Sequence, residues 1–195
     1  MWRATGVRWP AMAADPPDFI VVGERVALGP LRRDLAATYA RWVNHRDVRE
    51  GLMQLGIVTR ETEEQWVDDA VAKGAERPPV MVSFTIYDRS DDAPVGTAGL
   101  FKISYVHSNA EFGIAIGDRR GRGLGTEATR LTVEWAFRTL GLHNVMLGAL
   151  AWNEGALRAY EKAGFRRIGV RRAAEMSRGE RADVVYMDVV PEDLA

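Results

Sequence analysis

The sequence predicts an α/β fold in which a mixed sheet carries helices on both faces. Short apolar runs of strand length alternate with longer segments of helical period along the 195 residues. Helix caps or turns rich in Gly, Pro and Asp mark most changes of period. No internal repeat, low-complexity block or linker interrupts this pattern. Residues 19–195 are therefore expected to form a single domain after a flexible leader, residues 1–18, in which Met12 is an alternative start.

The first strand and two helices are expected before residue 74. Arg25–Leu31 is apolar and short enough for a strand. Asp34 is expected to cap a helix that runs to about Asn44, because apolar side chains recur there at helical spacing. Thr59 is expected to cap the helix Arg60–Lys73, whose first turn contains glutamates that favour the positive helix end.

Three strands are expected next. Val80–Tyr87 alternates between apolar and polar residues, as a half-buried strand does. The turn-rich segment Asp88–Pro94 connects it to a second strand, Pro94–Val106, and Asn109–Ile116 follows as the third.

The rest of the chain alternates helix and strand and closes with a hairpin across a polar turn. The expected elements are the helix Thr126–Leu140, the strand Val145–Leu150, the helix Asn153–Ala163, and the hairpin strands Phe165–Glu175 and Arg181–Val190. Asn153 can cap its helix because its side-chain oxygen accepts from a first-turn N–H. Gly164 can end the same helix at positive φ without strain.

A glycine- and arginine-rich segment connects the strand Asn109–Ile116 to the helix Thr126–Leu140. It reads Arg119-Arg120-Gly121-Arg122-Gly123-Leu124-Gly125-Thr126. A glycine-rich turn from a strand into a helix leaves backbone N–H groups free and directs the positive helix end at a ligand. The glycines remove side chains from that approach and the arginines add positive charge. The segment therefore predicts a site for a phosphate or pyrophosphate.

Two common phosphate-binding motifs are absent from the sequence. The lysines, Lys73, Lys102 and Lys162, do not stand where a P-loop requires one. The spacing Gly-x-Gly-x-Gly differs from the dinucleotide fingerprint, and the next apolar run ends in Ala151-Trp152 rather than in an acidic residue. An NAD-dependent oxidoreductase is left as one alternative.

Two segments together resemble the GNAT superfamily of acyl-CoA-dependent N-acyltransferases. Arg120–Gly125 matches its pyrophosphate signature, Gln/Arg-x-x-Gly-x-Gly/Ala. Asn153–Phe165 matches its second cofactor segment, in which an Asn opens a helix that carries a Tyr and ends in Gly-Phe. Ser104–Phe112 is similar to the branch that holds spermidine and ribosomal-protein N-acetyltransferases. The similarity covers about Gly23–Val190, whereas Glu50–Thr59, where substrate choice would lie, matches nothing diagnostic.

The resemblance implies a mostly antiparallel sheet of about seven strands in which the fourth and fifth strands separate. These strands are Glu111–Ile116 and Val145–Leu150, and the co-substrate acetyl-CoA would bind at the opening between them. Gly113 could mark a bulge that separates the strands and frees an N–H for the thioester carbonyl. The implied cofactor-binding residues are Ile114, Ala115, Ile116, Arg120, Gly121, Arg122, Gly123, Leu124, Gly125, Thr126, Asn153, Ala156 and Tyr160.

The resemblance also implies catalytic residues. Tyr160 matches the general acid that protonates the leaving thiolate. Glu111 lies where this branch carries a Glu and is the candidate base for the amine proton; the alternative is a structural carboxylate that holds the bulge or pairs with an arginine. His107 is a second candidate base or an ordinary surface residue. Three tryptophans could line an acceptor pocket or pack in the core: Trp42, Trp66 and Trp152.

Composition limits the classes of function. The net charge of −1 argues against general binding of nucleic acids. Cysteine is absent, and the three histidines are too scattered for a cluster, so no metal site is expected. No apolar run approaches the roughly 20 residues of a membrane span, and the first residues lack the apolar stretch of a signal peptide. We therefore expect a cytoplasmic protein that does not bind membranes.

Charge is unevenly distributed along the chain. Residues 59–92 contain nine acids and four bases, whereas residues 117–181 contain thirteen bases and seven acids. A basic half suits a polyphosphate cofactor and an acidic half suits a cationic acceptor. The alternative interpretation is two solvated faces without a ligand.

The predicted function is acetyl-CoA-dependent N-acetylation of a primary amine on a small molecule: a polyamine, amino acid, amino sugar or antibiotic. A protein N-terminal acetyltransferase of the ribosomal-protein type and a non-catalytic acyl-CoA-binding sensor are the alternatives. The resemblance also implies a homodimer. The nearly continuous apolar run Val184–Val190 is either a strand buried on both faces or a stripe that a second subunit covers.

Overall fold

The computed structural model describes residues 17–194, so the expected leader lies outside the described residues except for its last two. The strands are β1 (Val21–Val22), β2 (Val26–Pro30), β3 (Val82–Asp88), β4 (Ala93–Ser104), β5 (Asn109–Ile116), β6 (Asn144–Leu150), β7 (Arg166–Ser177) and β8 (Glu180–Val189). The α-helices are α1 (Ala36–Asn44), α2 (Arg46–Gly51), α3 (Arg60–Ala75), α4 (Leu124–Leu140) and α5 (Glu154–Lys162). Short 3₁₀ helices are η1 (Arg33–Leu35) and η2 (Pro191–Leu194).

The strands form one open sheet of eight strands in the order β1-β2-β3-β4-β5-β6-β8-β7. Neighbouring strands run antiparallel except for the parallel pair β5 and β6. The predicted mixed, mostly antiparallel sheet is therefore confirmed. The expected number of about seven strands is low by one, because the two-residue strand β1 is too short to show a period in the sequence.

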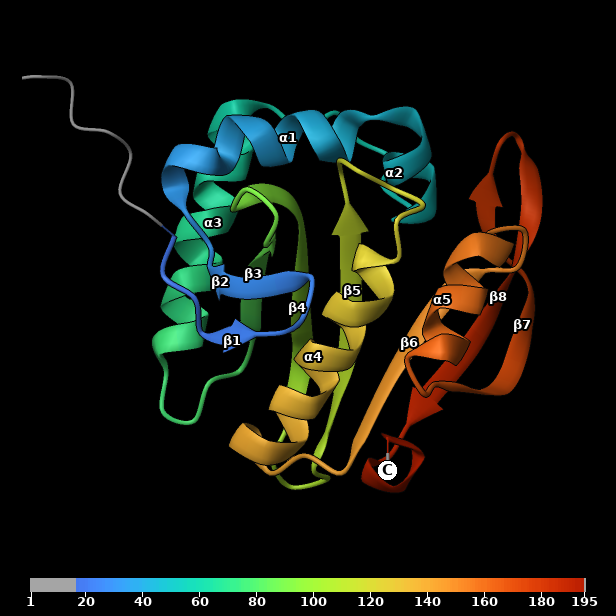
Figure 1. The fold of residues 1–195 in the computed structure, drawn as a ribbon. Helices are drawn as coiled ribbons and strands as arrows, with labels where there is room; N and C mark the ends of the chain where they lie inside the picture. Colours follow the sequence, from blue (N-terminus) through green and yellow to red (C-terminus); the bar gives the residue numbers. More distant parts are fainter. Residues whose placement is uncertain (1–16, 195) are drawn as a thin grey trace, which may run out of the picture.

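The parallel pair β5 and β6 is joined over a short length only. Asn109, Ala110 and Glu111 pair with the start of β6, and pairing ends there. Beyond that point β5 stays bonded to β4 and β6 to β8, so the two strands separate while each keeps one neighbour. Figure 1 shows the opening between them. The predicted separation of these strands is confirmed.

The prediction of a bulge at Gly113 is wrong. Gly113 pairs in regular register with Gly99 on β4, and the irregular pairing lies between Phe101 and Ser104 instead. The Phe101 ring covers Gly113, since a Cβ added there would lie 3.0 Å from ring atom Cε2. Glycine at this position therefore makes room for an aromatic ring.

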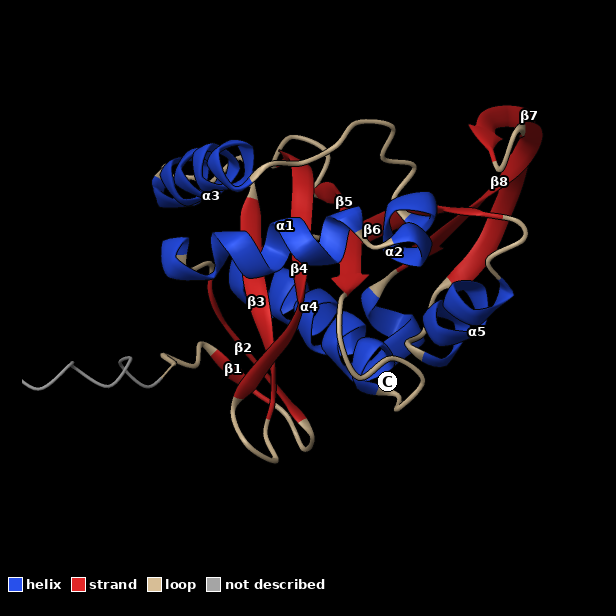
Figure 2. Cartoon of the chain, turned by 90° about the horizontal axis from the view of Figure 1, so that it is seen from above, coloured by secondary structure: helices blue, strands red, loops and turns tan. Residues whose placement is uncertain are grey.

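Helices cover both faces of the sheet, as expected. α1 and α3 lie on one face and α4 on the other, as Figure 2 shows from above. The larger core lies between α4 and the sheet and includes Phe84, Leu100 and Val133. A smaller core, which includes Tyr39 and Trp42, lies under α1 and α3. Within residues 17–194, no helix is long and apolar enough to cross a membrane.

The predicted helix caps have different outcomes. Thr59 caps α3 by accepting from the Thr62 N–H at 3.2 Å, and that prediction is confirmed. The Asp34 cap is wrong, because the carboxylate of Asp34 is bound to Arg32 at 2.6 Å and α1 begins after η1 without a side-chain cap. Helix α2 was not predicted, since six residues are too few to establish a period.

The apolar run near the C-terminus is explained within one chain. β8 lies between β6 and β7, and Val184, Val185, Met187 and Val189 are all buried. It therefore leaves no apolar stripe for a second subunit. Exposed apolar side chains occur instead on the edge strand β7, at Ile168 and Val170.

Gly117, directly after β5, gives a test of this packing. A Cβ at Gly117 would overlap the indole of Trp42, which is only 7% exposed and has no room to move. Gly117→Ala is expected to lower the free energy of unfolding by about 1–3 kcal/mol, as overpacking does. Gly155→Ala, on α5, is the control because its new Cβ would meet nothing within 4 Å. Urea denaturation measures both, and an unchanged value for Gly117→Ala would contradict the described contact.

Candidate active site

A groove of about 720 Å³ lies at the opening between β5 and β6. Its walls come from β5, the start of α4, α5, α2 and the turn of the β7–β8 hairpin. The structure brings together nearly every residue predicted to bind the cofactor: Ile114, Ala115, Ile116, Arg120, Gly121, Gly123, Leu124, Gly125, Thr126, Asn153, Ala156 and Tyr160. Arg122 is the exception and does not line the groove.

The glycine-rich segment forms a cradle at the N-terminus of α4. Gly121 and Gly123 have φ values of 78° and 80°, which glycine adopts without strain. Gly123 is the N-cap and no side chain caps the helix, so first-turn N–H groups are available to a ligand. A Cβ at Gly121 would meet nothing within 4 Å. The cradle fits an anionic group such as a pyrophosphate.

Ion pairs and hydrogen bonds hold both ends of the cradle. Arg119 contacts Asp88 at 2.7 Å and Asp91 at 2.6 Å. The Arg119 guanidinium, together with Ser90, holds the pKa of Asp88 well below its usual range. At the other end, Glu127 accepts from the Arg25 N–H at 2.9 Å. Arg119 is therefore used to position the segment, although it lines the groove.

Arg120 links the cradle to the region of α2. Its guanidinium lies 3.3 Å from the carboxylate of Asp47 and 3.3 Å from Nδ1 of His45. These contacts are long and lie at the surface. Arg158 and Lys162 line the same groove from α5, so cationic side chains surround the place where an anion would bind.

Helix α5 presents Tyr160 to the groove. Asn153 caps the helix by accepting from the Ala156 N–H at 3.3 Å, as predicted. The Tyr160 ring packs edge-on against Phe112, with centroids 6.4 Å apart, and also contacts Phe165. Burial raises the pKa of Tyr160 to about 12. No described residue hydrogen-bonds its hydroxyl, so the hydroxyl is protonated at neutral pH and available as a donor.

The turn of the last hairpin closes one side of the groove. Arg178 forms an ion pair with Glu50 of α2 at 2.8 Å. The same guanidinium lies 3.7 Å from the ring centroid of Trp152, a cation–π contact. Arg178 was not predicted from the sequence, because its role depends on a partner far away in the chain.

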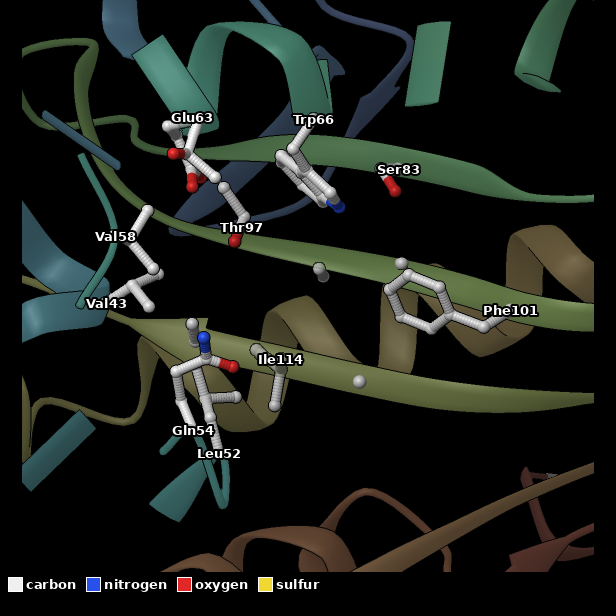
Figure 3. Close-up of a pocket in the computed structure, with 15 residues that line it drawn as sticks. Val43, Leu52, Gln54, Val58, Glu63, Trp66, Ser83, Thr97, Phe101 and Ile114 are labelled. Atoms are coloured by element: carbon white, nitrogen blue, oxygen red, sulfur yellow. The ribbon is translucent and has the colours of Figure 1, made fainter. Parts of the chain in front are cut away.

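A second cavity of about 320 Å³ lies between α3 and strands β3, β4 and β5 (Figure 3). It shares Leu52, Ile114 and Ala115 with the groove. The two cavities therefore meet at the part of β5 that no longer pairs with β6.

Two polar side chains that line the second cavity have no hydrogen-bond partner among the described residues. Glu63 projects from α3 towards the sheet (Figure 3) and is 7% exposed. Burial raises the pKa of Glu63 to about 7, and no described residue bonds its carboxylate. The buried hydroxyl of Ser83 also lacks a hydrogen bond within residues 17–194. From the sequence, Glu63 was expected only as one of the glutamates in the first turn of the helix Arg60–Lys73. Its spacing to Val67 nevertheless places both residues on one face of α3, and both are buried.

The other candidate side chains have different environments. Glu111 pairs with Lys102 at 2.9 Å and is not among the residues that line either cavity. This geometry fits the structural interpretation of Glu111, and its catalytic role stays a prediction. His107 is exposed in the β4–β5 turn. Trp66 lines the second cavity and Trp152 the groove, whereas Trp42 is part of the core.

Comparison with known proteins identifies relatives. Residues 25–166 match the model of the acetyltransferase (GNAT) domain family. A probable N-acetyltransferase of Bacillus subtilis is 40% identical over 91 residues, which is 46% of this chain and 50% of that protein. Spermidine N(1)-acetyltransferase of Escherichia coli K12 is 37% identical over 76 residues, 38% of this chain and 41% of that protein. The matched segment thus spans half or less of these curated relatives.

Solved structures show the same fold. Spermidine N-acetyltransferase from Vibrio cholerae, in complex with CoA and spermine, superposes with a TM-score of 0.78 at 21% identity over 87% of this chain and 98% of that one. A GNAT-family acetyltransferase from Bacillus anthracis superposes with a TM-score of 0.73 at 20% identity, over 88% and 98% of the two chains. Because the family match extends from β2 into β7 and these folds agree, the chain belongs to the GNAT acetyltransferase domain family.

Proposed function

We propose that this protein is an acetyl-CoA-dependent N-acetyltransferase that acts on a primary amine of a small molecule. The meeting of the groove and the second cavity at Ile114 and Ala115 carries the proposal. At that point β5 has an edge without a strand partner, and such an edge can pair with an extended, amide-containing ligand. One ligand can reach this edge through the groove and the other through the second cavity.

The residues of the groove have distinct tasks in this proposal. The N–H groups of residues 120–126 bind the pyrophosphate of acetyl-CoA. The free edge at Ile114–Ile116 binds the pantetheine arm. Asn153 and Ala156, at the start of α5, line the same groove. Acetyl-CoA, once bound, would supply the acetyl group as a thioester, with the CoA thiol as the leaving group.

Transfer requires that the nitrogen lose two protons and that the sulfur gain one. The amine attacks as the free base, so its ammonium proton must first be removed. The new N–C bond then forms as the C–S bond breaks, Tyr160 donates a proton to the departing sulfur, and the second proton of the nitrogen restores the tyrosine hydroxyl. The Tyr160 hydroxyl is protonated at neutral pH and Tyr160 lines the groove. Its place there supports an enzyme over a binding module, which has no use for an acid at the sulfur.

The acceptor class rests on two further observations. The second cavity is of a size that suits a small molecule, and curated relatives are named for spermidine. A polyamine, an amino acid, an amino sugar and an aminoglycoside antibiotic are the acceptors to be compared.

The proposal also assigns a location in the cell. The reaction needs acetyl-CoA, and the cytoplasm is the location that the proposal assigns; cell fractionation checks it.

The first prediction is acetyl transfer itself. Purified protein with acetyl-CoA and a library of amines is expected to release CoA, measured with a thiol reagent. Tyr160→Phe is expected to lower kcat about 100-fold or more with the dissociation constant of acetyl-CoA unchanged, as loss of a general acid does. Tyr105→Phe is the matched control, because Tyr105 bonds the Pro79 carbonyl outside the groove. Absence of transfer to every amine of the library, aryl and alkyl monoamines included, would refute the proposal, and an unchanged Tyr160→Phe rate would remove Tyr160 from the mechanism.

The second prediction concerns the cradle. Gly121→Asp is expected to weaken acetyl-CoA binding by roughly tenfold or more, since a carboxylate would face the pyrophosphate. Gly121→Asn adds a side chain of nearly the same shape without the charge, so the difference in affinity between the two variants measures the effect of the charge. Gly141→Asp controls for backbone strain, because Gly141 also has positive φ and open space but lies at the far end of α4. Calorimetric titration measures binding, and equal losses for Gly121→Asp and Gly141→Asp would contradict the cradle.

Association into a homodimer is the third prediction. Ile168 and Val170 are 56% and 57% exposed on the edge strand β7, and a second subunit would cover them. Light scattering is expected to give twice the chain mass of 21.7 kDa. The double change Ile168→Glu with Val170→Glu is expected to return the monomer mass. A wild-type mass of one chain would exclude the dimer.

A further inference from the structure

Glu63 is a buried carboxylate that the steps above do not use. It is 7% exposed, its neighbours raise its pKa to about 7 through burial alone, and no described residue pairs with it. A buried ionised group without a partner is strongly unfavourable. Its presence in a cavity that shares Leu52, Ile114 and Ala115 with the groove therefore indicates a cationic ligand.

The neighbouring acids on α3 have partners and face elsewhere. Glu64 pairs with Arg60 at 2.7 Å and with Arg33 at 3.4 Å. Asp68 pairs with Arg33 at 3.2 Å. Of the residues that line the second cavity, from α3, β3, β4, β5 and the segment after α2, Glu63 is the one with an ionisable side chain. The charge available to a ligand in this cavity is thus a single carboxylate.

The rest of the lining is apolar or neutral. Apolar side chains are contributed by Val43, Leu52, Val58, Trp66, Ala98, Phe101, Ile114 and Ala115. The neutral polar groups are Gln54, Thr62, Thr97 and the unbonded hydroxyl of Ser83. Figure 3 shows the aromatic rings of Trp66 and Phe101 on the same side of the cavity as Ser83, away from the Glu63 carboxylate. One ammonium would be neutralised here, whereas a second would lie among apolar groups.

On the basis of the proposed function, we infer that the second cavity is the acceptor subsite for a primary amine with a single positive charge and an apolar body, and that Glu63 binds the ammonium and accepts its proton. The aromatic lining accommodates an aryl or alkyl chain, and Ser83 offers a hydrogen bond to a neutral polar group on it. This class of acceptor differs from the polyamines for which the curated relatives are named.

The proton balance of this step is complete. The ammonium gives one proton to the carboxylate of Glu63, and the freed nitrogen lone pair forms the bond to the acetyl carbon. The C–S bond breaks, and the sulfur leaves as a thiol with the proton of Tyr160. The nitrogen, which is positively charged after the attack, loses its second proton to the tyrosinate and so becomes the neutral amide, and Glu63 releases the first proton to water. A carboxylic acid with a pKa near 7 is well matched to accept and release this proton at neutral pH.

Acceptor preference is the first arm of the test. We expect kcat/KM for 2-phenylethylamine, tyramine and hexylamine to exceed that for spermidine and spermine by about tenfold or more, because an unpaired buried ammonium costs at least that much. Equal or higher values for the polyamines would overturn the inference. If no amine is acetylated, the proposed function fails by itself. Calorimetric titration of 2-phenylethylamine into the protein saturated with CoA then tests whether the second cavity binds such an amine. Absence of binding there would overturn the inference as well.

Substitution of Glu63 is the second arm. Glu63→Gln keeps the shape of the side chain and is expected to lower kcat/KM about 100-fold or more, with loss of the rise in activity near pH 7. Glu64→Gln, on the same helix, is the matched control and is expected to leave activity and the pH profile unchanged. If Glu63→Gln kept the rise in activity near pH 7, the assignment of Glu63 as the base would be overturned. The same holds if Glu111→Gln, and not Glu63→Gln, lost that rise.

Stability gives a readout that does not need a substrate. The folded pKa of Glu63 lies above its value of 4.5 in the unfolded chain, so the cost of burying the ionised group is absent below pH 4.5 and full above pH 7. Glu63→Gln is therefore expected to melt several degrees above wild type at pH 8 and close to it at pH 5. Equal melting temperatures at pH 8 would show that the carboxylate is not buried without a partner, and would overturn the inference.

Discussion

The site depends on the early end of the parallel pairing between β5 and β6. After Glu111 and Met146 the two strands diverge, yet each remains bonded to its other neighbour. The sheet can therefore stay intact while one strand edge is free. The rings of Phe112, Tyr160 and Phe165 pack together beside this opening. Packing of α5 at the opening thus places the tyrosine hydroxyl on the side where the groove lies.

Charged side chains around the cradle are mostly engaged with other parts of the protein. Arg119 is held by Asp88 and Asp91, and Glu127 is held by the backbone of β2. These contacts fix the segment at both ends. The groups left for the ligand are chiefly backbone N–H donors, which are rigid and lose little entropy on binding. The second cavity follows the opposite arrangement, since its one charge is unbonded and buried.

Local signals in the sequence were sufficient for most elements and for an anion site at the glycine-rich segment, whereas the full groove was predicted from the resemblance to the GNAT superfamily. Asn153 and the glycines of the cradle act through short-range geometry, so their positions could be read from spacing alone. The cap at Asp34 failed because Arg32, two residues away, competes for the same carboxylate. Helix α2 lacks a period, and its position is set by the elements it contacts. The significance of Glu63 depends on which face of α3 meets the sheet, and the sequence indicates that face only through the spacing of Glu63 to Val67.

The ion pair between Glu50 and Arg178 has a consequence for synthesis of the chain. The two residues are 128 positions apart, and β8 must insert between β6 and β7 before the turn can reach α2. In a growing chain, the cradle and the α5 side chains Arg158 and Lys162 are made before the hairpin turn that carries Arg178 on the other side of the groove. Because chains emerge at about 5–20 residues per second, roughly one to five seconds separate synthesis of the end of α5 from that of the end of β8. A ligand that needs both walls therefore stabilises only chains whose last hairpin has folded, so that ligand binding selects completed protein over partly made protein.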